Sequence, residues 1–129
     1  MNTPDFLSNE DVLLLHDQQL VRYGGGQGVR DAGSFESAVA TAQASYGGEF
    51  VHGTLFAQAA AYAFHIAQNQ SLVDGNKRAA LAAALVFLDI NGISVADPEG
   101  KLYRAMIDIA ERRLDKPGLA ELLRDLSLA

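Results

Sequence analysis

Residues 73–78 bring together the kinds of side chain that bind phosphate and a metal ion. Their sequence, Val-Asp-Gly-Asn-Lys-Arg, holds one carboxylate, one glycine, one amide and two cations. Residues 79–88 then form an almost unbroken apolar run of helix-forming types, which predicts a loop leading into a buried helix. The first N–H groups of a helix have no internal partner, and the aligned peptide dipoles place roughly half a positive charge there. This end of the helix is therefore a ready site for an anion such as phosphate.

The side chains of this stretch suit different parts of such a site. Asp74 is placed to bind a divalent cation, because Mg²⁺ prefers carboxylate oxygen. Gly75 lets the backbone approach a ligand closely, and Lys77 and Arg78 supply fixed positive charge. A purely structural alternative stays open: Asp74 would cap the helix, Gly75 would form a turn, and the two cations would be solvated surface charges.

The run from Asp74 to Arg78 resembles the signature of the Fic and Doc (death-on-curing) family, whose motif runs His-x-Phe-x-Asp/Glu-Gly-Asn-Gly/Lys-Arg. Other segments resemble the family as well, so the likeness extends over roughly residues 7–127. These segments are residues 15–17 (Leu-His-Asp), 23–25 (Tyr-Gly-Gly), 28–31 (Gly-Val-Arg-Asp), 61–64 (Ala-Tyr-Ala-Phe) and 82–92. The resemblance implies the Fic fold, with the motif loop at the N-terminus of a central buried helix, and a site for ATP and Mg²⁺.

The resemblance also assigns roles to the residues of the motif. It implies that Asp74 ligates Mg²⁺ and that Gly75, Asn76 and Lys77 form an anion cradle, largely through backbone N–H groups. Arg78 would neutralise phosphate charge and, with Asn76, belongs to the catalytic set. The position of the family's histidine, which acts as the general base, is occupied by Gln70.

Two positions depart from the family motif. Gln70 replaces the histidine and Leu72 replaces the phenylalanine. A glutamine amide forms hydrogen bonds but takes up no proton near neutral pH. Because general-base catalysis contributes about 10²–10⁴ in rate, we expect weak activity or none. Leu72 keeps an apolar anchor for the loop and loses the area of the ring.

Two further positions indicate the branch of the family. Lys77 stands where many relatives have glycine, and Leu81 stands where AMP-transferring Fic proteins carry a second arginine. Both resemble the Doc branch, which implies a toxin that phosphorylates a hydroxyl side chain of a translation factor, elongation factor Tu, and is inhibited by a Phd-type antitoxin. AMP transfer is one alternative. A catalytically silent protein that binds nucleotide, target or antitoxin is another, and a purely structural helical domain is ranked last.

The composition suits a small intracellular domain. A chain of 129 residues with 49% hydrophobic content can bury one core, so a single domain is predicted over residues 1–129. It has no cysteine, which is compatible with a reducing cytoplasm, and residues 1–5 show no signal-peptide pattern. Apolar stretches are interrupted before about 18 residues, which argues against a membrane span. The net charge of −6 argues against direct binding to nucleic acid.

Hydrophobic periodicity predicts helices along almost the whole chain. The capping-box pattern at residues 8–11 (Ser-Asn-Glu-Asp) predicts a first helix that ends at Gly24. Ser34 is expected to cap a second helix, which the glycine pair at residues 47–48 would interrupt. Thr54 is expected to open a third helix, whose alanine-rich face favours close packing.

The second half of the chain continues this pattern. The central helix is predicted from residue 76 to about residue 91, with Gly92 just after its end. Residues 93–95 alternate and indicate a short extended piece. Proline at the first helical position predicts further helix starts at residues 97–99 (Asp-Pro-Glu) and at Pro117. The prediction is an all-α fold of about six helices.

The remaining candidates for chemistry are weaker. His16, His52 and His65 do not form a metal pair at helical spacing, and His65 is interpreted as a hydrogen-bonded structural residue. An oriented base made by His16 and Asp17 has no nucleophile signature to serve. The glycines at residues 24–28 lack the setting of a phosphate loop.

Two segments bear on target binding and regulation. The connection at residues 24–33, with Arg30 and Asp31, is the nearest match to the flap that guides the target's backbone in Fic relatives. An inhibitory helix of the kind carried by some Fic proteins has its closest counterpart at residues 45–49, where two glycines interrupt it. We therefore expect inhibition from outside the chain.

Overall fold

The computed structural model describes residues 3–128, and within that range the protein is built of six α-helices. These are α1 (Asn9–Tyr23), α2 (Ala32–Ala40), α3 (Leu55–Asn69), α4 (Asn76–Ile90), α5 (Lys101–Ala110) and α6 (Lys116–Leu126). A 3-10 turn, η1 (Thr41–Gln43), and four two-residue strands, β1 (Ser45–Tyr46), β2 (Glu49–Phe50), β3 (Ser94–Val95) and β4 (Ser127–Leu128), complete the fold. The prediction of an all-α fold is confirmed.

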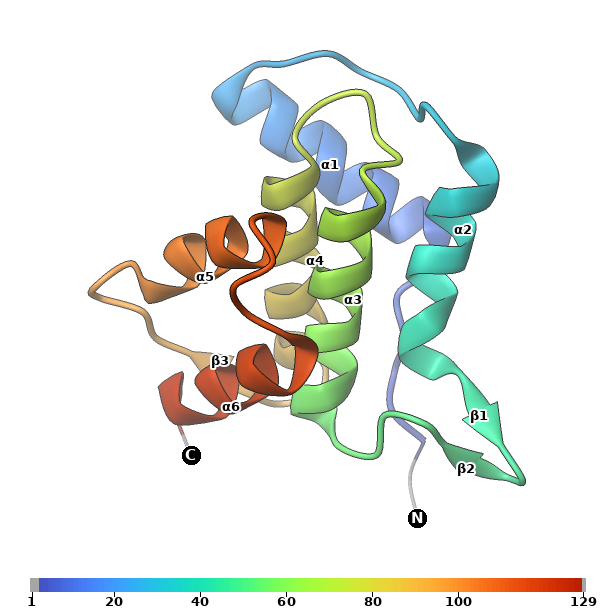
Figure 1. The fold of residues 1–129 in the computed structure, drawn as a ribbon, viewed down its shortest axis with the longest axis vertical. Helices are drawn as coiled ribbons and strands as arrows, with labels where there is room; N and C mark the ends of the chain where they lie inside the picture. Colours follow the sequence, from blue (N-terminus) through green and yellow to red (C-terminus); the bar gives the residue numbers. More distant parts are fainter. Residues whose placement is uncertain (1–2, 129) are drawn as a thin grey trace.

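Helices α3 and α4 lie side by side at the centre, with α2 on one side, α5 and α6 on the other, and α1 crossing near the end where the α3–α4 loop lies (Figure 1). The loop that joins α3 to α4 lies at one end of the molecule, where the connection between α1 and α2 also passes (Figure 1). The two strand pairs are antiparallel, β1 with β2 and β3 with β4. None of the helices within residues 3–128 has the length and apolar character needed to span a membrane.

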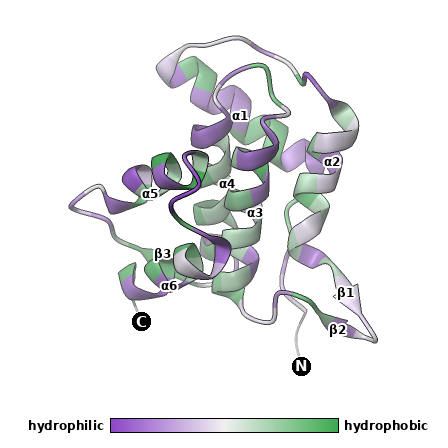
Figure 2. Cartoon of the chain, viewed as in Figure 1, coloured by the Kyte–Doolittle hydropathy of each residue, from purple (hydrophilic) through white to green (hydrophobic). Residues whose placement is uncertain are grey.

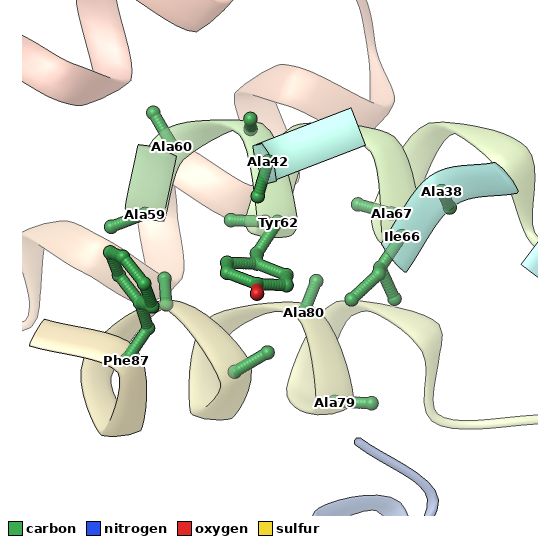
Figure 3. Packing of buried hydrophobic residues seen from close by; sticks show 14 of the residues in the cluster. Ala38, Ala42, Ala59, Ala60, Tyr62, Ile66, Ala67, Ala79, Ala80 and Phe87 are labelled. Carbon is green, nitrogen blue, oxygen red and sulfur yellow. The ribbon is translucent and has the colours of Figure 1, made fainter. Parts of the chain in front are cut away.

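Small side chains allow α3 and α4 to pack closely. Alanines fill much of both facing surfaces, and Tyr62 and Phe87 occupy the space between the helices (Figure 3). The rings of Tyr62 and Phe87 have centroids 5.2 Å apart. The buried Tyr62 hydroxyl accepts a hydrogen bond from the Leu7 N–H at 2.8 Å, and burial raises the pKa of Tyr62 to about 12. This tight pair is a rigid base for the loop between the two helices.

Several predicted helix ends are confirmed. Ser8 and Asp11 form the capping box of α1, and Thr54 caps α3 through the Ala57 N–H. The central helix ends at Ile90, and Gly92 follows with a φ of 87°. Figure 2 shows hydrophilic residues at the ends of α3 and α4 nearest their connecting loop, in contrast to the apolar turns farther away. Hydrophilic side chains are thus concentrated at the end of the α3–α4 pair where the connecting loop lies.

The predicted start and end of the second helix are wrong. Its cap is Asp31, whose carboxylate accepts a hydrogen bond from the Ser34 N–H at 3.1 Å, so Ser34 lies inside α2. The helix ends at Ala40, and the glycines at residues 47–48 form the turn between β1 and β2. Both glycines have positive φ, which suits a hairpin turn. Residues 45–49 are therefore part of a hairpin.

The predicted start of the fifth helix is also wrong. Pro98 lies in a turn, and α5 begins at Lys101 after Gly100, which has a φ of 70°. The Asp97 carboxylate still serves the helix, because it accepts hydrogen bonds from the N–H groups of Lys101 and Leu102, both at 2.8 Å. Helix α6 begins at Lys116, one residue before Pro117, and is capped by Asp115.

Candidate functional site

The loop between α3 and α4 forms the wall of a cavity of about 300 Å³. All six site residues predicted from the sequence line this cavity, together with residues from the α1–α2 connection and from α3 and α5. The lining residues are Arg30, Ala67, Gln70, Val73, Asp74, Gly75, Asn76, Lys77, Arg78, Tyr103 and Ala110. Three of these side chains are cationic and one is anionic, in a chain whose net charge is −6. The cavity therefore favours a small anionic ligand.

The N-terminus of α4 opens into this cavity without a capping side chain. Gly75 is the residue before the helix, and no side chain within residues 3–128 caps α4. The other helices differ, because Ser8, Asp31, Thr54 and Asp115 cap four of them and the Asp97 carboxylate binds the first amides of α5. The first N–H groups of α4 are thus available to a ligand.

Asp74 is held by backbone groups on both carboxylate oxygens. The Gly75 N–H donates to its Oδ1 at 2.8 Å, and the Gly26 N–H donates to its Oδ2 at 3.3 Å. Asp74 therefore precedes the helix rather than capping it. Each oxygen retains lone pairs, so the carboxylate can bind a Mg²⁺ ion that takes its other ligands from phosphate and water. The described part of the chain has no group of three or more histidine, cysteine or acidic side chains that could hold a metal ion.

The backbone of Asp74 is fixed from α1. His16 is buried, and its Nε2 donates a hydrogen bond to the Asp74 carbonyl oxygen at 2.6 Å. A Cβ atom at Gly75 would lie 3.5 Å from the same nitrogen, and Gly75 has a φ of 72°. His16 thus supports the loop where it enters α4, which the sequence did not indicate.

The Asn76 side chain serves the loop itself. Its Oδ1 accepts a hydrogen bond from the Leu72 N–H at 3.0 Å, and its Nδ2 donates to the Leu72 carbonyl at 3.1 Å. Leu72 is fully buried and anchors the loop in the core. Because both polar atoms of the Asn76 side chain bind Leu72, we expect Asn76 to bind a ligand in the cavity mainly through its backbone N–H.

Gln70 lines the cavity and has an unusual backbone conformation. It follows the last residue of α3 with a φ of 47° and a ψ of 42°, in the left-handed region. Its carbonyl oxygen accepts a hydrogen bond from the Arg30 guanidinium, and its side chain is exposed. A residue other than glycine in this region is uncommon and stores strain, which is frequent at functional sites.

Arg78 lies between the cavity and an aromatic ring. Its guanidinium carbon is 4.6 Å from the centroid of the Tyr23 ring, a cation–π distance. Arg78 and Tyr103 also line a neighbouring cavity of about 370 Å³ whose walls are mostly apolar, and Leu81 is one of its lining residues. Arg78 therefore lines both cavities. A ligand with a charged group in the first cavity and an apolar group in the second would contact it.

Sequence comparison identifies the family of this chain. A family model described as the Fic/DOC family matches residues 6–88, which is more than half of the chain. The chain belongs to the Fic/DOC family. It is 38% identical over 128 residues to a protein named Toxin Doc from Mycolicibacterium smegmatis, which covers 97% of this chain and 95% of that relative. It is 36% identical over 121 residues to Protein kinase doc of Escherichia phage P1, covering 93% and 94%. The predicted family and its Doc branch are confirmed.

The other two histidines lie away from the Fic/DOC motif loop. Lys116 Nζ donates hydrogen bonds to His65 Nε2 at 2.9 Å and to His52 Nε2 at 3.2 Å. Burial and the Lys116 charge lower the pKa of His52, and burial, Lys116 and His52 lower the pKa of His65 to about 4. His65 does not line the motif cavity, and its hydrogen bond links α3 to α6.

Sequence reasoning missed contacts that cross long stretches of chain. The Arg30 guanidinium reaches residue 70, and Tyr23 and Tyr103 reach Arg78 or its cavity. The sequence holds one signal for these contacts, because residues 24–33 are the nearest match to the Fic flap. This connection lies against the motif loop, with Val29 and Leu72 forming an antiparallel bridge.

Proposed function

We propose that this chain is a Doc-type toxin whose site transfers phosphate from ATP to a hydroxyl side chain of a translation factor, at a low rate because Gln70 replaces the histidine. The observation that carries the proposal is the uncapped N-terminus of α4, which faces a cavity lined by Asp74, Lys77 and Arg78. Elongation factor Tu is the proposed target, and a Phd-type antitoxin is the proposed inhibitor.

The residues of the cavity suit the charge that moves in such a transfer. The amides at the start of α4, with Lys77 and Arg78, can bind phosphate oxygens. Asp74 would hold Mg²⁺, which when bound neutralises phosphate charge. The neighbouring apolar cavity beside Arg78 has room for the nucleoside part of ATP. Phosphoryl transfer depends mainly on positioning and electrostatics, so the site keeps much of what the reaction needs.

Gln70 lacks the base function. In the proposed reaction, the bond between the γ phosphorus and its bridging oxygen breaks, a bond to the target hydroxyl forms, and ADP leaves. The hydroxyl proton must go to an acceptor, and the Gln70 amide takes up no proton near neutral pH. Transfer therefore has to rely on a weaker acceptor, such as water or a phosphate oxygen.

Replacing Gln70 by histidine tests the proposal directly. Histidine is enriched in the left-handed backbone region that residue 70 occupies, so Gln70→His should be accommodated. We expect transfer of label from γ-labelled ATP to elongation factor Tu, in the presence of Mg²⁺, to rise by about 10²–10⁴ over the wild type. The control is Gln70→Asn, which keeps an amide and suits the same backbone.

The label and the control decide between the alternatives. Label from α-labelled ATP would indicate AMP transfer, in which pyrophosphate leaves. Equal transfer by both variants would contradict the assignment of the base position. The native Gln70, which stands where the family motif has histidine, favours a second candidate, a catalytically silent protein that still binds nucleotide and antitoxin. Absence of label from every variant, together with ATP binding measured by calorimetry, would support that candidate.

A further inference from the structure

The connection between α1 and α2 pairs with the motif loop along its length. The Val73 N–H donates to the Gly28 carbonyl at 3.0 Å. The N–H groups of Arg30 and Asp31 both donate to the Ser71 carbonyl, at 2.7 and 3.1 Å. With the antiparallel bridge between Val29 and Leu72, these bonds form a short two-stranded ribbon. Both segments lie at the same end of the molecule (Figure 1). We call residues 24–31 the clasp.

One side chain of the clasp holds the backbone of residue 70. The Arg30 guanidinium donates to the Gln70 carbonyl, at the C-terminal end of α3. The carbonyl groups at a helix end lack internal partners, and a cation is stabilised there by the helix dipole. Because Gln70 has a strained left-handed conformation, its surroundings must hold it in place. Arg30 provides that support from the clasp.

The glycines of the clasp approach the Asp74 carboxylate. The Gly26 N–H donates to Asp74 Oδ2 at 3.3 Å. A Cβ atom at Gly25 would lie 2.9 Å from the same oxygen and 3.0 Å from a Leu20 methyl group. Real Cβ atoms do not approach an oxygen that closely, so only glycine at position 25 lets the clasp lie against the carboxylate in its present rotamer.

We propose that the clasp is a positioning device for the site: it fixes the Asp74 carboxylate through Gly25 and Gly26 and the backbone of residue 70 through Arg30. If the site binds ATP and Mg²⁺ as in the proposed function, on which this step rests, the clasp sets the affinity of the site for Mg²⁺. Groups that orient a metal ligand from outside typically change metal affinity about 10–100-fold when they are altered. Gly25 and Gly26 do not line the cavity and act through Asp74, whereas Arg30 acts through the backbone of Gln70.

The chain offers a matched pair of variants for the test. Gly24 and Gly25 are neighbours with positive φ, 80° and 125°, so alanine is strained at both. A Cβ atom at Gly24 meets nothing within 4 Å, whereas at Gly25 it meets Asp74. ATP binding would be measured by calorimetry while Mg²⁺ is varied. We expect Gly25→Ala to weaken the apparent Mg²⁺ affinity about tenfold and to leave Mg²⁺-free ATP binding unchanged. Gly24→Ala should behave as the wild type, and an equal effect of both variants would overturn the proposal.

A second measurement needs no nucleotide. Amide hydrogen exchange should show protection at Val73, whose N–H binds Gly28, and Arg30→Ala should speed its exchange about tenfold. Arg30→Lys should restore part of the protection, while amides within α4 stay unchanged in both variants. If the wild-type Val73 amide is unprotected, the clasp proposal fails whatever ATP does. If it is protected but the protein binds no ATP, the proposed function fails and the clasp remains supported.

Discussion

Two side chains in the first turn of α4 have different tasks in spite of their neighbouring positions. Asn76 uses both amide atoms to hold the backbone of Leu72, whereas Arg78 lies with its guanidinium over Tyr23 and faces the cavity. The sequence could indicate that both residues belong to one site. It could not separate their tasks, because the choice between a loop partner and a ligand depends on where the Leu72 backbone lies in three dimensions.

The position of Arg78 leads to a prediction about nucleotide binding. A hydrogen bond to a charged group contributes about 1.5–3 kcal/mol, so Arg78→Ala should lower ATP affinity at least about tenfold. Arg22 provides the matched control, because its guanidinium also lies near the Tyr23 ring, at 5.4 Å, but it does not line the cavity. Calorimetry on both variants should show a loss only for Arg78→Ala. Unchanged affinity would contradict the phosphate role of Arg78.

At the scale of elements, two helices end in the same way with different residues. After α4, the Gly92 N–H binds the Asp89 carbonyl and the Ile93 N–H binds the Leu88 carbonyl. After α5, the N–H groups of Arg112 and Arg113 form the equivalent bonds to Ile109 and Asp108. This arrangement requires a left-handed residue, and glycine is the usual one. Arg112 adopts it with a φ of 62°.

The comparison of these two ends predicts a stabilising substitution. Arg112→Gly should remove the strain of a side chain in the left-handed region and raise the free energy of unfolding by about 0.5–1 kcal/mol. Urea unfolding is the measurement. Arg112→Ala is the control, because it removes the same charge and keeps the strain. A gain of equal size in Arg112→Ala would assign the effect to charge rather than to the backbone.

Local signals predicted some elements well and misled at others. The capping box at Ser8 and the glycine after α4 were found because those patterns act within a few residues. Local chemistry favours Ser34 as a cap, but the backbone of Asp31 is held by Ser71 across the clasp, which fixes where α2 begins. Pro98 is typical of a helix start, yet Gly100 allows the turn in which the Asp97 carboxylate accepts hydrogen bonds from the amides beyond it.

At the scale of the whole molecule, the candidate site depends on contacts that no local pattern encodes. Its loop residues were predicted because they are contiguous and carry distinctive chemistry. His16 and Arg30 were not assigned their contacts, because they meet the loop from 58 and 40 residues away in the sequence. Such pairings are decided by how α1 and the clasp pack on the central helix pair. A buried histidine and an exposed arginine have many other uses in proteins.

The packing of α6 on α3 should make the stability of the protein depend on pH. Lys116 bridges His65 on α3 and His52 before it, and burial, Lys116 and His52 lower the pKa of His65 to about 4. The unfolded chain, with histidine near 6.5, binds more protons in this range than the folded protein does, so stability rises with pH. The contribution is present above about pH 6.5 and is lost as pH falls toward 4.

We expect the free energy of unfolding to fall by on the order of 1 kcal/mol between about pH 7 and pH 5, after allowance for the partial exposure of the His65 ring. Urea unfolding across this range is the measurement. His65→Gln keeps a side chain that can accept from Lys116 but does not titrate, so its slope should be shallower than that of the wild type. His52→Gln should have a similar effect, because burial and Lys116 also lower the pKa of His52. If the wild type and both variants lose the same free energy of unfolding, the pH dependence comes from carboxylates elsewhere, and His52 and His65 contribute none of it.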